Sequence, residues 1–150
     1  MRHPTALLAG LFGMLLMPAC AQQPADLHLA PQPIDYDGKP DLEYRVNGTI
    51  VALDGYHVSD TGRYIRMQFE GRELLLKLTR RNKEERIYEA SGLVVTFRDV
   101  VYGECTGEGS QAVKGTLHIR RGEATYSTPF DGSDTEFPSR ECQEVGNDGY

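Results

Sequence analysis

Apolar and polar residues alternate along most of the chain after residue 42. In the stretch RYIRMQFEG, the residues Ile65, Met67 and Phe69 fall on one face, and polar side chains separate them. The same period of two recurs in ELLLKLT, GLVVTFRDVVY and KGTLHIRR. Because side chains point to opposite faces at successive positions of a strand, this pattern predicts strands with one buried face rather than helices.

Seven or eight strands are expected, with turn residues roughly every 8–12 positions. They lie near 43–53, 63–70, 73–80, 86–90, 93–102, 113–121 and 123–130. The first divides in two if Asn47-Gly48 forms a tight turn. Short connections such as Gly71-Arg72 and Arg121-Gly122 join neighbouring strands as hairpins.

The predicted fold class is therefore all-β, with antiparallel strands in sequence order. Two architectures fit: a small up-and-down barrel, of the size of a lipocalin or a lysozyme inhibitor, and a two-sheet sandwich. The barrel is favoured because it leaves no exposed strand edges.

The N-terminus has the features of an export signal. Arg2 and His3 precede the apolar stretch ALLAGLFGMLLM, residues 6–17. Twelve residues are too few to span a bilayer, which takes about 20. A positively charged start, a short apolar stretch and small residues after it are typical of a cleaved signal peptide.

Two cleavage sites are compatible with this signal. Ala19 and Ala21 satisfy the small-x-small rule for an ordinary secretory cleavage after Ala21. The sequence LMPAC, ending at Cys20, resembles the lipobox of bacterial lipoproteins. The resemblance implies a signal peptide over residues 1–19, lipidation of Cys20 and anchoring in the outer membrane. With the secretory cleavage, the protein is soluble in the periplasm or secreted.

A proline-rich segment follows the signal peptide. Residues 20–42 show no sustained periodicity, and their composition predicts a flexible, disordered tether. Since a tether is useful when its far end is fixed, this segment favours the lipid anchor. The tether is followed by a single β-domain, expected over 43–142, and by a loose tail over 143–150.

The cysteines predict one disulfide bond. Lipidation or cleavage removes Cys20 from thiol chemistry, which leaves Cys105 and Cys142 as a pair in an exported chain. Their bond would close a loop of about 38 residues, worth about 4 kcal/mol in the chain-entropy model.

No catalytic motif is found, and we expect neither an enzyme nor a cofactor or metal site. The formal net charge of −6 argues against nucleic acid as a partner. The membrane is expected to be contacted only through the lipid anchor.

Acidic residues gather in the two segments that the disulfide would bring together. They are Glu104, Glu108, Asp131, Asp134 and Glu136. This acidic rim predicts electrostatic binding of a cationic protein, although two solvated loops would have the same composition. The function expected is an envelope-anchored periplasmic binding module, in its sharpest form an inhibitor or immunity-type protein that engages a lysozyme or toxin. The alternative is a structural or sensory lipoprotein in envelope assembly or stress response.

Overall fold

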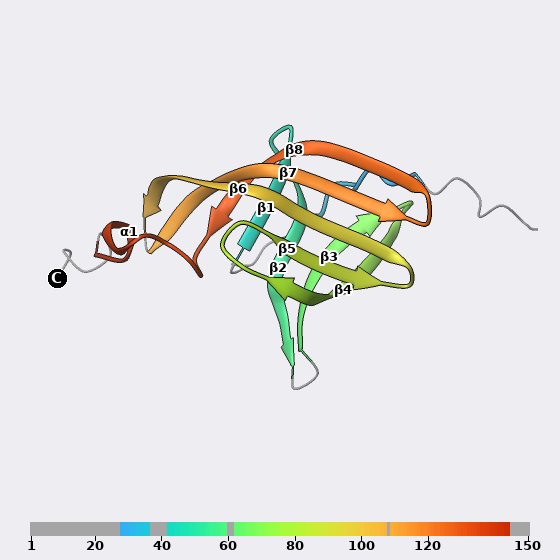
Figure 1. The fold of residues 1–150 in the computed structure, drawn as a ribbon, viewed down its shortest axis with the longest axis horizontal. Coiled ribbons are helices and arrows are strands. Elements are labelled where there is room, and N and C mark those ends of the chain that lie inside the picture. The colour runs from blue at the N-terminus through green and yellow to red at the C-terminus, as the bar shows by residue number, and fades with distance from the viewer. Residues whose placement is uncertain (1–27, 37–41, 60–61, 108, 145–150) are drawn as a thin grey trace, which may run out of the picture.

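The computed structural model describes residues 28–36, 42–59, 62–107 and 109–144, and it is a closed antiparallel barrel of eight strands in sequence order (Figure 1). The strands are β1 (Leu42–Val46), β2 (Thr49–Ser59), β3 (Gly62–Phe69), β4 (Arg72–Arg81), β5 (Arg86–Ala90), β6 (Leu93–Gly107), β7 (Ser110–Arg121) and β8 (Ala124–Asp134). One short helix, α1 (Arg140–Glu144), follows. The predicted all-β up-and-down barrel is confirmed, and the sandwich is not formed.

Several hairpins turn on two residues with positive φ. Asn47 and Gly48 have φ of 51° and 77°, and the β1–β2 ladder begins directly beside them with Val46 opposite Thr49. Positive φ at both central residues matches the right-handed twist of the flanking strands. The predicted strand 43–53 is therefore two strands joined by a tight turn.

Side chains fill the interior of the barrel. The predicted inward residues Ile65, Met67 and Phe69 are all buried. At the centre the rings of Tyr44 and Phe97 stack with their centroids 3.9 Å apart. A barrel of eight strands is just wide enough for side chains to fill, and this one is filled with aromatic and aliphatic groups.

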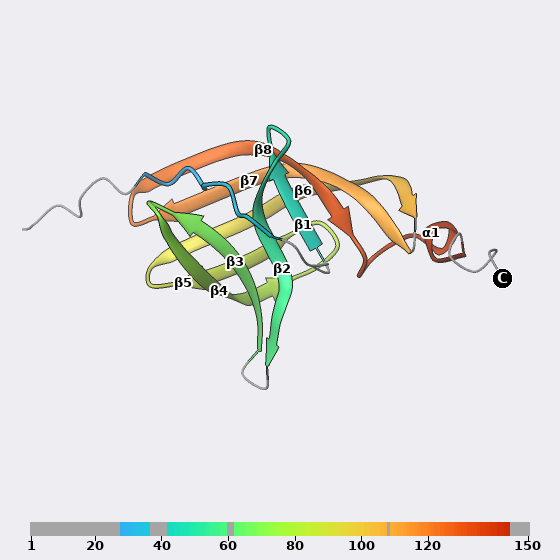
Figure 2. The ribbon, with the colours of Figure 1, turned by 180° about the vertical axis from the view of Figure 1, so that it is seen from behind.

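Residues 28–36, here called the N-terminal strap, lie along the outside of the barrel across β2 and β3 (Figure 2). The backbone N–H of Gln32 donates to the carbonyl of Gln68 at 2.8 Å, and that of Ile34 donates to Ile50 at 2.9 Å. Leu29 and Ile34 are buried. The strap falls within the predicted tether 20–42 but belongs to the folded domain; Cys20 lies outside the described residues.

The distribution of apolar residues along β2 explains why the strap has to cover this strand. Its outward-facing residues Val51 and Leu53 are apolar, and so are the inward-facing residues beside them. Val51 and Leu53 are both buried in the structure. A strand that is apolar on both faces requires a cover on each. The order of apolar and polar residues within 28–36 does not identify this segment as that cover.

Four strands run further than their apolar alternation predicts. The ladder of β2 and β3 continues to Ser59 opposite Gly62. The ladder of β6 and β7 continues to Gly107 and Ser110, and β8 continues to Asp134. Backbone hydrogen bonds do not depend on side-chain polarity, so pairing persists where the alternation stops. Among the residues described, no helix has the length and apolarity to cross a bilayer.

The strap should contribute measurably to stability. Replacing Leu29, which is 6% exposed, by Ala should lower the free energy of unfolding by about 2–5 kcal/mol, as for other buried leucines. Leu75→Ala is the matched control, because Leu75 is 42% exposed and its loss should cost less than about 1 kcal/mol. Urea denaturation of the mature chain measures both. Equal costs would contradict a structural role for the strap.

Candidate functional site

A network of charged side chains closes one end of the barrel, which we call the mouth. Its members come from the middle of β2, from the ends of β3, β4, β5 and β8, and from the residue two positions after β8. They are Asp54, Arg63, Arg81, Arg86, Asp134 and Glu136. The side chains of Asp54, Arg86 and Asp134 have no exposed surface, so each depends on its partners inside the protein.

Arg86 and Asp134 form the centre of the mouth. The Nη2 group of Arg86 donates to Oδ2 of Asp134, and the same oxygen accepts from the hydroxyl of Tyr102 at 2.8 Å. Burial alone would lower the pKa of Arg86, but the charges of Tyr44 and Asp134 outweigh it and raise that pKa. Arg86 therefore remains a cation inside the barrel.

Asp54 forms the second half of the network. Its Oδ2 accepts from the hydroxyl of Tyr88, and its Oδ1 accepts from Nε of Arg63 at 2.7 Å. Burial, followed by the nearby charges of Tyr44 and Asp54, raises the pKa of Tyr88 well above the usual value. The phenol thus remains a hydrogen-bond donor to the carboxylate.

Residues 135–139, the C-terminal cap, cover the mouth. Oδ1 of Asp134 accepts from the backbone N–H of Glu136 at 2.7 Å and of Phe137 at 3.2 Å, which turns the chain back after β8. The Glu136 carboxylate pairs with Arg63 and, at 2.5 Å, with Arg81. The guanidinium of Arg81 lies 4.6 Å from the centroid of the Phe137 ring. Charge pairs and one ring contact therefore hold the cap in place.

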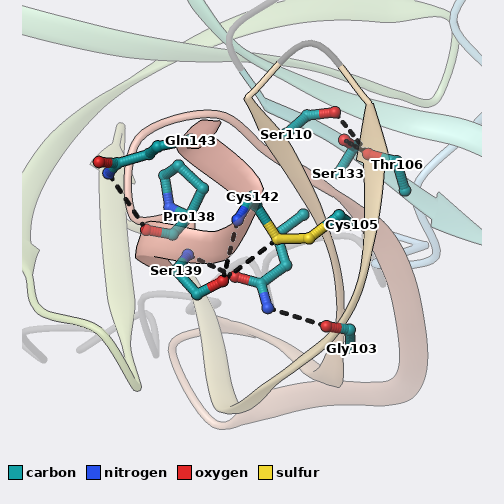
Figure 3. The surroundings of a disulfide bond; sticks show 10 residues. Gly103, Cys105, Thr106, Ser110, Ser133, Pro138, Ser139, Cys142 and Gln143 are labelled. Atoms are coloured by element: carbon teal, nitrogen blue, oxygen red, sulfur yellow. Dashed lines mark hydrogen bonds between the residues drawn. A yellow bond between two sulfur atoms is a disulfide. The ribbon is translucent and has the colours of Figure 1, made fainter. Parts of the chain in front are cut away.

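The predicted disulfide between Cys105 and Cys142 is present and joins α1 to β6 (Figure 3). Beside it, the side chain of Gln111 accepts from the backbone N–H of Ser139 at 2.9 Å and donates to the carbonyl of Gly103 at 2.8 Å. The sequence did not predict α1, which has only five residues.

The structure does not gather the five predicted acidic residues on one rim. Asp134 and Glu136 are engaged with arginines in the mouth. Asp131 is exposed and lies opposite Lys114 of β7, while Glu104 is exposed on β6. Glu108 lies outside the described residues. The split has a simple cause: Asp131 and Asp134 are three positions apart on one strand, so they point to opposite faces.

A β-bulge in β6 shapes the outer wall of the barrel. The register passes from Arg98 opposite Thr116 to Val101 opposite Lys114, so two residues of β6 face the single residue Gly115. A Cβ at Gly115 would lie 2.6 Å from the carbonyl oxygen of Arg98, which is why only glycine fits there.

Two grooves, of about 530 and 500 Å³, lie on either side of this bulge. Asp99 and Val101 line both of them. Asp99 has φ of 56°, in the left-handed region, and the Val101 side chain is 55% exposed. No local signal in the sequence distinguishes Val101 from the buried valines around it.

Among the described residues, no three His, Cys, Asp or Glu side chains are arranged to hold a metal ion.

Replacing both Cys105 and Cys142 by Ser should lower the free energy of unfolding by at most about 4 kcal/mol, because the unfolded chain regains the freedom of the closed loop. The far-ultraviolet circular dichroism should change little, since Cys105 is exposed and Cys142, although buried, lies outside the core cluster of the barrel. Non-reducing peptide mapping checks the bond itself. Free alkylation of both thiols in protein isolated without reductant would contradict it.

The network also predicts a loss of stability at alkaline pH. Burial, together with the hydrogen bond to Asp134, raises the pKa of Tyr102 to about 12, and burial also raises the pKa of Tyr44 and Tyr88. Unfolded tyrosine titrates near 10. Between about pH 10 and 12 the unfolded chain therefore loses protons that the folded chain keeps, and stability falls as pH rises.

Urea midpoints at several pH values measure this fall. Tyr102→Phe should make it shallower, and the control Tyr126→Phe, on β8 outside the network, should leave its slope unchanged. A midpoint constant up to pH 11.5 would show that the tyrosines of the mouth do not titrate as the structure requires.

Comparison of the chain with models of known protein families, with curated proteins and with solved structures finds no match in any of the three. Two candidate surfaces stand out by their geometry. They are the charged mouth with its cap, and the outer wall at the β6 bulge.

Proposed function

We propose that this protein is a binding module of the bacterial envelope and that it engages a protein partner through the outer wall of its barrel at the β6 bulge. The observation that carries this proposal is the exposed Val101 between two grooves. Bulges often re-aim a side chain at functional places in a sheet. Here the bulge turns an apolar residue outward beside two depressions.

The filled interior supports an outer-surface mode of binding. Tyr44, Phe97 and Phe130 pack edge to face or stacked at the centre, and each is at most 3% exposed. A ligand of the kind that larger barrels enclose would have to displace these rings. The wall at the bulge needs no such rearrangement.

The surroundings of Val101 have the composition of a small protein interface. Apolar surface from Val101 and Pro129 lies among the charged residues Asp99, Lys114 and Asp131. An apolar centre with a polar rim is the usual anatomy of such interfaces. The rim carries both positive and negative side chains and therefore has little net charge of its own. Attraction of a cationic partner would come from the net charge of −6 of the whole chain.

The sharper form of the proposal is an inhibitor or immunity-type protein against a lysozyme or a cationic toxin. Export by the N-terminal signal and lipidation of Cys20 would place it in the periplasm, on the outer membrane. From there it would meet cationic proteins that enter the envelope. An anionic binder of this kind associates faster with its target at low ionic strength.

Cross-linking in the anchored protein tests the surface. A photoreactive amino acid at Val101 should capture one protein of basic character, and capture should weaken as salt rises from about 50 to 500 mM, because screening shortens the range of the attraction. The control position is Leu75 on β4, which is also apolar and exposed. Equal capture at both positions, or none at Val101, would contradict the proposal.

Inhibition assays test the sharper form. The purified protein should inhibit peptidoglycan hydrolysis by at least one class of lysozyme. Val101→Asp should weaken inhibition more than about tenfold, as for a central interface residue, while Leu75→Asp should not. If no lysozyme is inhibited although Val101 still captures a basic protein, the partner belongs to another class.

A further inference from the structure

The mouth contains hydrogen-bonding groups that the described part of the chain does not satisfy. Arg86 has no exposed surface, yet its Nε and Nη1 groups have no acceptor among the described residues. In the same network, Oε2 of Glu136 is buried without a donor. Buried polar groups are nearly always paired, so unpaired groups of both kinds in one place need an explanation.

The cap places a ligand-like pair of groups into this mouth. Glu136 offers a carboxylate to Arg63 and Arg81, and the next residue, Phe137, offers an aromatic ring to Arg81 and, with its centroid 5.8 Å from the guanidinium, to Arg86. A carboxylate beside a ring is what a site built of arginines would recognise. The fit is incomplete, because the carboxylate does not reach the unpaired donors of Arg86.

The charges of the mouth balance only while the cap is in place. Three arginines face three carboxylates there, and Asp54 and Asp134 belong to the barrel strands. Moving Glu136 away leaves one positive charge in excess. The open mouth would then attract one carboxylate from solution.

The attachment of the cap allows such a movement. The backbone N–H groups of Glu136 and Phe137 donate to Asp134. The other end of the cap is bonded elsewhere: the N–H of Ser139 donates to Gln111, and the carbonyls of Pro138 and Ser139 accept from Gln143 of α1. The disulfide at Cys142 retains the chain beyond the cap. An external ligand would therefore replace only the side-chain contacts of Glu136 and Phe137 with the arginines, while Ser139 and the disulfide keep the end of the cap attached.

We infer that the mouth is a recognition site for a small carboxylate bearing an aromatic group, and that Glu136 and Phe137 occupy it as an internal ligand. An external carboxylate displaces Glu136, pairs with Arg63 and Arg81, and reaches the free donors of Arg86. Competition with the cap lowers the apparent affinity of the intact protein. This site is separate from the protein-binding wall at Val101.

Titration calorimetry with phenylacetate tests the site in the mature chain with its disulfide intact. The variant Glu136→Gln/Phe137→Ala should bind phenylacetate at least about tenfold more tightly than the wild type, because the carboxylate and the ring of the cap no longer compete for the arginines. The affinity for phenylacetamide, the neutral analogue, should rise much less between the wild type and this variant. Adding Arg81→Gln to the variant should remove most of the gain.

Controls separate a ligand site from a structural cap. Glu104→Gln, which removes an exposed carboxylate on β6, should leave the affinity for phenylacetate unchanged. If the double variant keeps its β-type circular dichroism and disulfide but gains no affinity, or if phenylacetamide binds equally well, the inference is overturned. Should that variant fail to fold, Glu136→Gln alone is titrated in the same way. Failure of both to fold would show that the cap is a structural element, which also overturns it.

Discussion

The ion pair between Arg86 and Asp134 is the constraint on which the charged end of the barrel depends. Neither side chain has any exposed surface, and the two are 48 residues apart in the chain. An unpaired buried charge costs several kcal/mol, so the start of β5 and the end of β8 have to meet. The second oxygen of Asp134 then turns the chain into the cap, which brings Glu136 to Arg63 and Arg81. This pair thus fixes the end of β8 against the start of β5 and sets the path of the cap that follows.

The two candidate surfaces differ in what they offer a partner. The outer wall at the β6 bulge is open to solvent and mixes apolar and charged groups around Val101. The mouth is buried, is built from arginines and carboxylates, and is covered by its own chain. A protein can dock on the wall without disturbing the core, whereas a ligand of the mouth has to displace the cap. The surface proposed for a protein and the site proposed for a small carboxylate are therefore separate on one small barrel.

Much of the barrel could be predicted because its cause is local. Alternation at Ile65, Met67 and Phe69 identified a strand and its buried face, and all three are inside the barrel. Turn residues such as Asn47-Gly48 adopt the positive φ that a two-residue hairpin needs. The disulfide followed from counting cysteines in a chain predicted to be exported. Each of these inferences needs only neighbouring residues or the number of a residue type.

The candidate site was less predictable, because burial of a charge depends on a partner far away in sequence. Asp131, Asp134 and Glu136 read as one acidic segment, yet Asp131 faces solvent while the other two pair with arginines. Val101 is exposed only because the bulge in β6 shifts its register against β7.

The sequence by itself determined the central part of the strands, most of their turns and the inward face of each alternating stretch, since the period of side chains along a strand is a local property. The tertiary structure alone decided that the strap covers β2 and that the cap closes the mouth. Leu29 in a proline-rich segment and Glu136 in a polar one have no periodic pattern. Their positions follow from apolar surface and buried charge that exist only once the distant strands have come together.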